Sequence, residues 1–426
     1  MKYLHHNSAS VTRFLQEFIL DEGNNWSFFP DHQETVIEYP AGFSGRIPFF
    51  INEFWTAKQR QASSIHEISY RACFKAQLPR FFINLLTEPG DLVYDPFSGR
   101  GTTLIEAALL GRKVIANDVN PLSAILARPR LGVPNIDDIK FRLAELNFAR
   151  GLQADLDLSM FYHPVTEAEI IALRNYLRQR KAENAEDDLD RWLRMVATNR
   201  LTGHSSGFFS VYTLPPNQAV SPERQKKINL KRNQSPDYRN VKEIIVRKTA
   251  SLVKHLKPEE MGNLKKAAQT AVFLEHDAAT TPEIKSNSVN LTVTSPPFLD
   301  IVQYSKDNWL RCWFNGLDSA AIEKRLTMAK TVEAWSEAMG RVFLELFRIT
   351  VLGGWVVFEV GEVRKGKIKL EEYVIDLGGK VGFSCAGVLI NRQSFTKTAN
   401  IWGVNNNSQG TNTNRIVLFQ KNNRLS

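Results

Sequence analysis

One carboxylate and two glycines form the part of this sequence whose residue types and spacing are best suited to holding a ligand. Asp95 follows the apolar, β-prone run 92–94, and Gly99 and Gly101 come shortly after it. Glycines let the backbone approach a bound group closely, and a helix that begins at Thr102 would offer unpaired N–H groups to an anion. The pattern therefore predicts a strand, a glycine turn and a helix around a phosphate or carboxylate.

A second carboxylate follows at a distance that is typical of nucleotide-binding units. Asp118 ends the β-prone run 113–117 and lies 23 positions after Asp95. Nucleotide-binding α/β units place a ribose-binding acid about 20 residues after the glycine turn. A full dinucleotide fingerprint would have a third glycine where this chain has Leu104. The spacing predicts a nucleoside cofactor and does not single out NAD.

A third motif, T-S-P-P-F at residues 294–298, follows the strand-like run 289–293. Together with D-P-F-x-G-x-G-T-T at residues 95–103, it resembles the S-adenosylmethionine-dependent amino-methyltransferases of DNA, which methylate N4 of cytosine or N6 of adenine. The resemblance covers most of residues 65–420. It implies S-adenosyl-L-methionine as the cofactor and DNA as the partner. It also implies an α/β fold, with a doubly wound, mostly parallel seven-stranded sheet and an antiparallel final strand.

The resemblance assigns a cofactor role to three acids and to the glycine turn. In the family, the acid at Asp277, which ends the strand-like run 271–277, accepts a hydrogen bond from the cofactor adenine. The segment 66–86 resembles the one that closes over the methionine end of the cofactor, where Ser69 or Lys75 would help to hold the carboxylate. The expected cofactor residues are Asp95, Phe97, Gly99, Gly101, Thr102, Asp118, Asp277, Ser69 and Lys75.

The expected catalytic residues are Ser295, Pro296, Pro297 and Phe298. An exocyclic base amine is a poor nucleophile, so hydrogen-bond acceptors must orient its lone pair toward the methyl donor. Consecutive prolines remove backbone donors and fix φ, which leaves carbonyl groups exposed beside the Ser295 hydroxyl. The family assigns the second acceptor to the Pro296 carbonyl, and the Phe298 ring could stack on a flipped base. Because positioning supplies much of the rate enhancement, we expect neither a covalent nucleophile nor a metal.

The residue before the proline pair bears on the choice of base. In the resembling enzymes, serine at this position usually accompanies cytosine N4, whereas aspartate or asparagine accompanies adenine N6. The prediction is site-specific DNA N4-cytosine methylation. The alternatives are N6-adenine methylation, amide methylation of a protein and a catalytically silent DNA-binding protein. Cytosine C5 methylation is set aside because it needs a cysteine after proline, and Ala72, Arg311 and Ser384 precede the three cysteines.

Composition is that of a globular protein, with 43% hydrophobic and 23% charged residues among 426. We find neither a signal-peptide pattern nor 18 consecutive apolar residues, so no membrane association is expected and the prokaryotic cytoplasm or nucleoid is the expected location. Cys73, Cys312 and Cys385 lack zinc-site spacing and are expected to be buried free thiols. The resemblance is also compatible with a role in restriction-modification, in which a cognate restriction endonuclease would be a functional rather than a physical partner.

The elements that position these residues divide the chain into four parts. Residues 1–60 have no assignable role, and residues 61–131 form the cofactor-binding first half of the core. Residues 132–266 form a helical, basic insertion that we interpret as target recognition, and residues 267–426 form the catalytic second half.

Positive charge is concentrated at the end of the insertion. Residues 221–266 contain 13 Lys or Arg against 5 Asp or Glu, an excess of +8 in a chain of net charge +9. Clustered positive charge supplies phosphate affinity, although a solvated basic helix is the alternative. The expected DNA contacts are Lys226, Lys227, Lys231 and Arg232. An Asn/Thr-rich stretch at 396–407 is either a surface connection or a second DNA contact.

Overall fold

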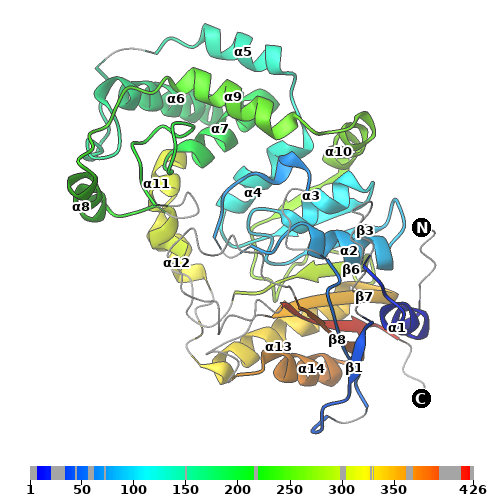
Figure 1. The fold of residues 1–426 in the computed structure, drawn as a ribbon. Helices are drawn as coiled ribbons and strands as arrows, with labels where there is room; N and C mark the ends of the chain where they lie inside the picture. Colours follow the sequence, from blue (N-terminus) through cyan, green and yellow to red (C-terminus); the bar gives the residue numbers. More distant parts are fainter. Residues whose placement is uncertain are drawn as a thin grey trace, which may run out of the picture.

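A computed structural model describes the chain over most of its length. The described residues are 7–20, 34–43, 46–55, 62–71, 73–148, 151–214, 219–297, 304–326, 329, 331–360, 368–392 and 414–422. Helices cover both faces of a single β-sheet, and a further layer of helices lies above one end of it (Figure 1). In this described part, we find no helix that combines the length and apolar character needed to cross a membrane.

The sheet contains nine strands within the described residues, in the order β1-β2-β8-β9-β7-β6-β3-β4-β5. The strands are β1 (Val36–Glu38), β2 (Phe49–Asn52), β3 (Leu92–Asp95), β4 (Lys113–Asn117), β5 (Val272–Leu274), β6 (Val289–Thr294), β7 (Thr350–Val360), β8 (Ser384–Asn391) and β9 (Asn414–Gln420). β9 is antiparallel to both of its neighbours, and β1 is antiparallel to β2. All other neighbouring pairs are parallel.

The predicted α/β class and the antiparallel final strand are confirmed, whereas the predicted number of seven strands is wrong. The two additional strands come from the N-terminal segment, because β2 pairs in parallel with β8 and carries β1 at its outer edge. All four residues of β2 are buried. Four apolar and polar residues between Pro48 and Glu53 are too short a run for periodicity to identify as a strand.

The described residues contain fourteen α-helices. They are α1 (Ser8–Gln16), α2 (Gln77–Leu86), α3 (Thr102–Leu109), α4 (Leu122–Ala127), α5 (Ile136–Glu145), α6 (Pro164–Ala182), α7 (Asp188–Arg200), α8 (Pro222–Arg232), α9 (Val241–Val253), α10 (Pro258–Thr270), α11 (Tyr304–Asn315), α12 (Ser319–Arg325), α13 (Val332–Ile349) and α14 (Leu370–Val381). Two short 3-10 helices, η2 (Ser64–His66) and η3 (Arg128–Leu131), precede α2 and follow α4. α13 and α14 pack on one face of the sheet, and α2, α3 and α10 pack on the other (Figure 1).

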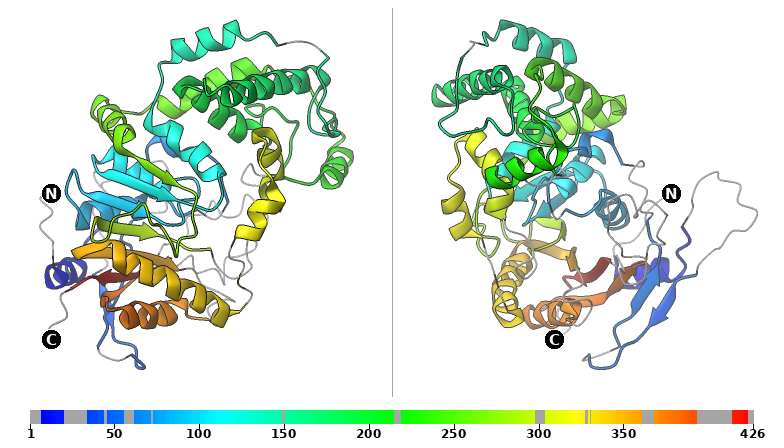
Figure 2. Two further views of the ribbon diagram at one scale, coloured as in Figure 1. Left: turned by 180° about the vertical axis from the view of Figure 1, so that it is seen from behind. Right: turned by 60° about the vertical axis from the view of Figure 1, so that its left-hand side comes forward.

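Residues 132–266 contain α5 to α10, and these helices lie in two different places. α5 to α9 form the upper layer, whereas α10 returns to the sheet and packs on α3 and β4 (Figures 1 and 2). Within the layer, the buried Trp192 of α7 donates from Nε1 to Thr249 Oγ1 of α9 at 2.9 Å. α7 begins with a capping box in which Asp187 and Asp190 each accept from the other's backbone N–H, a pattern that favours a sharp helix start.

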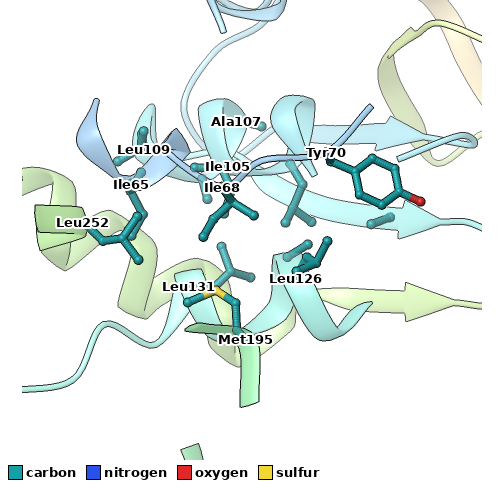
Figure 3. Close-up of a cluster of buried hydrophobic side chains, with 14 of the residues drawn as sticks. Ile65, Ile68, Tyr70, Ile105, Ala107, Leu109, Leu126, Leu131, Met195 and Leu252 are labelled. Atoms are coloured by element: carbon teal, nitrogen blue, oxygen red, sulfur yellow. The ribbon is translucent and has the colours of Figure 1, made fainter. Parts of the chain in front are cut away.

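The helical layer and the glycine-turn helix share one apolar core. Ile65 and Ile68, in the segment before α2, pack between Ile105 of α3 and Met195 of α7 (Figure 3). Leu252 of α9 belongs to the same cluster. The segment 64–70, which we call the strap, therefore lies between the first half of the sheet unit and the helical layer.

Candidate active site

A cavity opens where the carboxyl ends of β3, β4 and β6 meet, together with the turn after β5. In a parallel sheet the residues that follow adjacent strands meet at one edge, which is where ligands bind in open α/β sheets. Nine of the residues expected from the sequence line this cavity: Asp95, Phe97, Gly99, Thr102, Asp118, Asp277, Ser295, Pro296 and Pro297. The structure thus brings together motifs that are about 200 residues apart in the chain.

The glycine turn has a backbone conformation that favours glycine. Gly99 has φ +52° and Gly101 has φ +78°, both in the left-handed region. A Cβ atom on Gly101 would lie 2.6 Å from the Cβ of Ala127 in α4. Gly101 does not line the cavity. It lets α3 begin directly against α4 and so fixes the position of the turn.

Asp95 links the two principal motifs. Its Oδ1 accepts from the Thr294 hydroxyl at 2.6 Å and from the Phe97 N–H at 3.1 Å. Thr294 immediately precedes Ser295, so this bond ties the glycine turn to the Ser-Pro-Pro turn. Burial raises the pKa of Asp95 to about 7, against the hydrogen bonds from Thr294 and Phe97, which lower it.

Asp118 follows β4 and closes the glycine turn from the other side. Its Oδ2 accepts from the Gly99 N–H at 2.8 Å and its Oδ1 from the Asn120 N–H at 2.9 Å. Burial raises the pKa of this carboxyl to about 6, and the charge of Glu275 adds to the rise. Each carboxylate oxygen can accept more than one hydrogen bond, so Asp118 retains acceptor capacity toward the cavity.

Asp277 lies on an exposed turn after β5. Its Oδ1 accepts from the Ala279 N–H at 2.9 Å. The turn is held against β4 by Asn117, which exchanges two hydrogen bonds of 2.9 and 3.0 Å with the backbone of His276. The His276 ring also lines the cavity, but its Nε2 pairs with Glu283 at 2.7 Å.

Ser295 has a buried carboxylate behind it. The Ser295 side chain hydrogen-bonds to Glu359, near the end of β7, and Asn414 Nδ2 donates to Glu359 Oε1 at 2.9 Å. Burial raises the pKa of Glu359, while these two hydrogen bonds lower it. Trp335 Nε1 donates to the Pro297 carbonyl at 3.0 Å, which fixes the proline turn against α13.

Sequence reasoning missed Glu359 as a site residue. A single acid in the apolar run 355–360 has no motif around it, and only the pairing of β7 with β6 brings it next to Ser295. The one available signal was the presence of an acid inside an apolar strand, because acidic residues are almost never fully buried unless they have a partner.

Two of the expected cofactor residues flank the cavity rather than line it. The cavity wall includes Tyr70 and Phe74, whereas Ser69 and Lys75 at either side are not among the lining residues. The Ser69 carbonyl accepts from Asn199 Nδ2 at 3.1 Å and from an Arg311 amino group at 3.0 Å. Ser69 thus anchors the strap to the helical layer.

Arg71 lines the cavity and is a further residue that sequence reasoning did not select. Its guanidinium pairs with the Asp307 carboxylate of α11 at 2.6 Å. The pair joins the residue that follows the strap to α11. Phe298, the fourth expected catalytic residue, lies outside the described residues, as does the stretch 396–407.

The expected DNA-contact residues lie on α8, which is on the opposite side of the molecule from α10 in Figure 1. Lys226 pairs with Asp157 at 3.5 Å, and the Arg232 guanidinium lies 3.8 Å from the centre of the Tyr212 ring. Lys227 and Lys231 are exposed. None of the four lines the cavity, so their contribution to DNA binding stays a prediction.

The cysteines are free thiols, as expected, but only Cys312 is fully buried. Cys73 is half-buried and lines the cavity, and burial raises the pKa of its thiol. Within the described residues, no group of three or more His, Cys, Asp or Glu side chains is arranged to hold a metal ion.

Comparison with known proteins finds similarity to DNA methylases over part of the chain. Residues 48–124 match the N6/N4 family model described as DNA methylase. The chain is 25% identical over 258 residues to the type II methyltransferase M.MvaI of Kocuria varians, covering 54% of this chain and 52% of the relative. It is 47% identical over 53 residues to the type II methyltransferase M.PvuII of Proteus hauseri, covering 12% and 16%.

Solved structures give weaker likenesses. TTHA0409 of Thermus thermophilus, solved in complex with S-adenosyl-L-methionine, has 23% identity and a TM-score of 0.22 over 34% of this chain and 54% of that one. This chain spans about half or less of the length of the curated relatives named here. The chain thus resembles DNA methylases over residues 48–124, and type II methyltransferases are among the relatives to which it is similar.

Proposed function

We propose that this chain transfers a methyl group from S-adenosyl-L-methionine to N4 of a flipped cytosine in DNA. The observation that carries the proposal is the meeting of three carboxylates, the glycine turn and the Ser-Pro-Pro turn around one cavity. The family match supports DNA as the substrate, and the cofactor is the one that the sequence motifs imply. A restriction-modification role with a cognate endonuclease forms part of the proposal, since M.MvaI and M.PvuII are type II methyltransferases.

The residues on the cofactor side fit S-adenosyl-L-methionine. Asp118 would accept from the ribose hydroxyls, and the exposed Asp277 would accept from the adenine amine, as each has acceptor capacity left. The left-handed Gly99 lets the backbone approach the ligand closely. When bound, the cofactor supplies an electrophilic methyl group on a sulfonium centre.

The catalytic side offers acceptors for an amine. Because the Ser295 hydroxyl donates a hydrogen bond to Glu359, the lone pairs of its oxygen are available to accept an amine hydrogen. The Pro297 carbonyl is engaged by Trp335, so we assign the second acceptor to the Pro296 carbonyl. As the new N–C bond forms, the amine must lose a proton; we assign its acceptance to the Ser295 oxygen, which passes its own hydroxyl proton to the Glu359 carboxylate.

Adenine N6 is the alternative target, because the Ser295 and Glu359 pair could accept a hydrogen from either exocyclic amine. The deciding experiment is to express the chain in a host and to separate the nucleosides of the host DNA by mass spectrometry. We expect N4-methylcytosine, which should disappear in Ser295→Ala. N6-methyladenine that is lost in the same variant would overturn the base assignment. Neither product, with cofactor binding intact, would favour a silent DNA-binding protein or a substrate other than DNA.

A further inference from the structure

A row of polar side chains crosses the sheet at the edge that borders the cavity. Asn52 at the end of β2 pairs in register with Asn391 of β8, and Asn391 stands opposite Asn414 of β9. Glu359 near the end of β7 comes next, followed by Ser295 directly after β6. We call these five residues the polar row. It leads from the N-terminal segment to the Ser-Pro-Pro turn.

The members of the polar row lie on one face of the sheet. Side chains alternate between the two faces along a strand, so residues two positions apart share a face. The residues two positions from each member all pack in the core that contains α2 and α3: Phe50, Leu389, Ile416, Val357 and Val293. Asn52, Asn391 and Glu359 are 5%, 0% and 6% exposed. Polar groups that are buried to this degree need hydrogen-bond partners.

The first two members of the row fasten the N-terminal segment. Asn391 Oδ1 accepts from the Phe54 N–H at 2.7 Å. Asn52 Nδ2 donates to the Phe18 carbonyl at 3.1 Å. The N-terminal segment therefore fixes the end of β8, which is the strand end that pairs with Asn414.

The other three members of the row form a hydrogen-bonded group. Asn414 Nδ2 donates to Glu359 Oε1 at 2.9 Å, and the Ser295 hydroxyl also hydrogen-bonds to the Glu359 carboxylate. Burial raises the pKa of Glu359, and these two hydrogen bonds lower it. Two neutral donors thus take the place of a counter-charge.

The charged groups on the neighbouring elements are engaged elsewhere. Arg415, next to Asn414 on β9, pairs with Glu371 of α14, which packs on the opposite face of the sheet. Asp95 on β3, beyond β6, accepts from a hydroxyl and a backbone N–H. Arg392, directly after β8, is exposed. The ionisation of Glu359 therefore depends on its two neutral donors.

The protonation state of Glu359 decides in which direction its hydrogen bond with Ser295 runs. An ionised carboxylate only accepts, so the serine hydroxyl donates to it and keeps its oxygen lone pairs for the base amine. A protonated carboxyl can donate to the serine oxygen instead, and it cannot take up the serine proton. The Nδ2 group of Asn414 can only donate, so it stabilises the ionised form.

We propose that Asn414 is a positioning residue of the active site, which keeps Glu359 ionised and oriented to accept the hydroxyl hydrogen of Ser295. The inference rests on the proposed function. During transfer, the amine proton passes to the Ser295 oxygen as the serine proton passes to Glu359, and Asn414 keeps its own protons. The strand β2 takes part indirectly, because it fixes the strand end that pairs with Asn414.

The first test measures methyl transfer to DNA across pH in Asn414→Asp and Asn414→Ala. Aspartate has nearly the shape of asparagine, but its ionised side chain cannot donate and adds a negative charge beside Glu359. We expect kcat at neutral pH to fall by roughly 10- to 100-fold in both variants, with the affinity for S-adenosyl-L-methionine unchanged. The loss should shrink as pH rises, because Glu359 then ionises at higher pH. The control Asn175→Asp, at an exposed asparagine of α6, should leave kcat unchanged.

The second test does not need activity. Losing a donor raises the folded-state pKa of Glu359 further, and the resulting loss of stability is present only where the carboxyl ionises. Chemical denaturation should therefore show that Asn414→Ala destabilises the fold more at pH 8 than at pH 5. In the Glu359→Gln background, Asn414→Ala should have the same effect at both pH values. A wild-type chain that does not methylate DNA would overturn the proposed function, and this cycle would still decide whether Asn414 holds Glu359.

Two results would overturn the inference. One is a wild-type kcat and pH profile in Asn414→Asp, which would show that Asn414 only fills space beside Glu359. The other is a loss of stability in Asn414→Ala that is the same at pH 5 and pH 8 when Glu359 is present.

Discussion

Of the carboxylates of the candidate site, Asp95 is buried and Asp118 is half-buried, and both lack counter-charges among the described residues. Within the described residues, neither Asp95 nor Asp118 forms an ion pair, and their partners are a hydroxyl and backbone N–H groups. Burial raises the pKa of these groups to about 7 and about 6. Acids with such raised pKa values in a cavity are typical of functional sites, because a ligand with hydrogen-bond donors can offset the free-energy cost of burying them.

At the residue scale, we first predict unequal effects of removing two cofactor acids. Asp118→Ala should weaken S-adenosyl-L-methionine binding by about 10- to 100-fold, because it removes a charged acceptor and also the bond that holds the Gly99 N–H. Asp277→Ala should weaken binding less, since this acid is exposed. Calorimetry measures both, with Glu337→Ala on α13 as the control. If both variants bind the cofactor with wild-type affinity, neither carboxylate contacts the cofactor.

A second prediction concerns pH. A carboxyl whose pKa is raised by folding destabilises the folded state when it ionises. The pKa of Asp95 is near 3.8 in the unfolded chain and about 7 in the folded protein, so the stability that protonated Asp95 contributes is lost as pH rises between these two values. Asp95→Asn removes this charge. The stability of the variant relative to wild type, without cofactor, should therefore be greater at pH 8 than at pH 5 by roughly 2 kcal/mol.

Chemical denaturation at the two pH values gives this difference. Any loss of the Thr294 hydrogen bond in the variant is independent of pH and cancels. If the variant and the wild type differ in stability by the same amount at both pH values, folding does not raise the pKa of Asp95.

At the scale of elements, local sequence patterns predicted the first half of the sheet well. The strand, glycine turn and helix around Asp95, and the strand that leads to Asp118, lie where spacing and apolar runs placed them. Charge along the sequence was less informative, because the basic stretch 221–266 is divided among α8, α9 and α10, and α8 and α10 lie on opposite sides of the molecule. Lys248 and Lys242, within that stretch, are also used internally, on Glu67 and on the Leu146 carbonyl.

The basic helix α8 gives a third prediction. Lys227 and Lys231 are exposed on it, so the double change to alanine should flatten the salt dependence of duplex DNA binding by up to about 1.8 in log–log slope, or about 0.9 per lost phosphate contact. The matched pair Lys265→Ala and Lys266→Ala, on α10, should leave the slope unchanged. Fluorescence anisotropy over a salt series measures both. An unchanged slope in the α8 variant would mean that this helix faces solvent in the complex.

At the scale of the whole molecule, long-range pairing determined what the sequence could not reveal. The sheet edge formed by β1 and β2 depends on contacts with β8, more than 330 residues later in the chain. Asn391 at the end of β8 accepts from the Phe54 N–H at 2.7 Å and so holds the N-terminal segment in place. Glu359 likewise reaches Ser295 only through the parallel pairing of β7 with β6.

The fourth prediction is that the N-terminal aromatic residues stabilise the fold. Phe54 is 2% exposed and lies 5.8 Å, ring centre to ring centre, from Phe81 of α2. Phe54→Ala should lower the free energy of unfolding by about 3–5 kcal/mol, because it leaves a cavity in the core. Phe141→Ala, the same change at a side chain that is 68% exposed, should have little effect. If the two variants are equally stable, the Phe54 side chain does not stabilise the core.

In the proposed function, the cavity aligns a cofactor methyl group with a base amine at Ser295. The most direct measurement is to incubate the purified chain with methyl-labelled S-adenosyl-L-methionine and duplex DNA, and to identify the labelled nucleoside. We expect label in N4-methylcytosine, lost in Ser295→Ala and reduced by at least about tenfold in Glu359→Gln, with cofactor affinity retained in both variants. Label that persists undiminished in Ser295→Ala, or no label in DNA when the cofactor is bound, would contradict it.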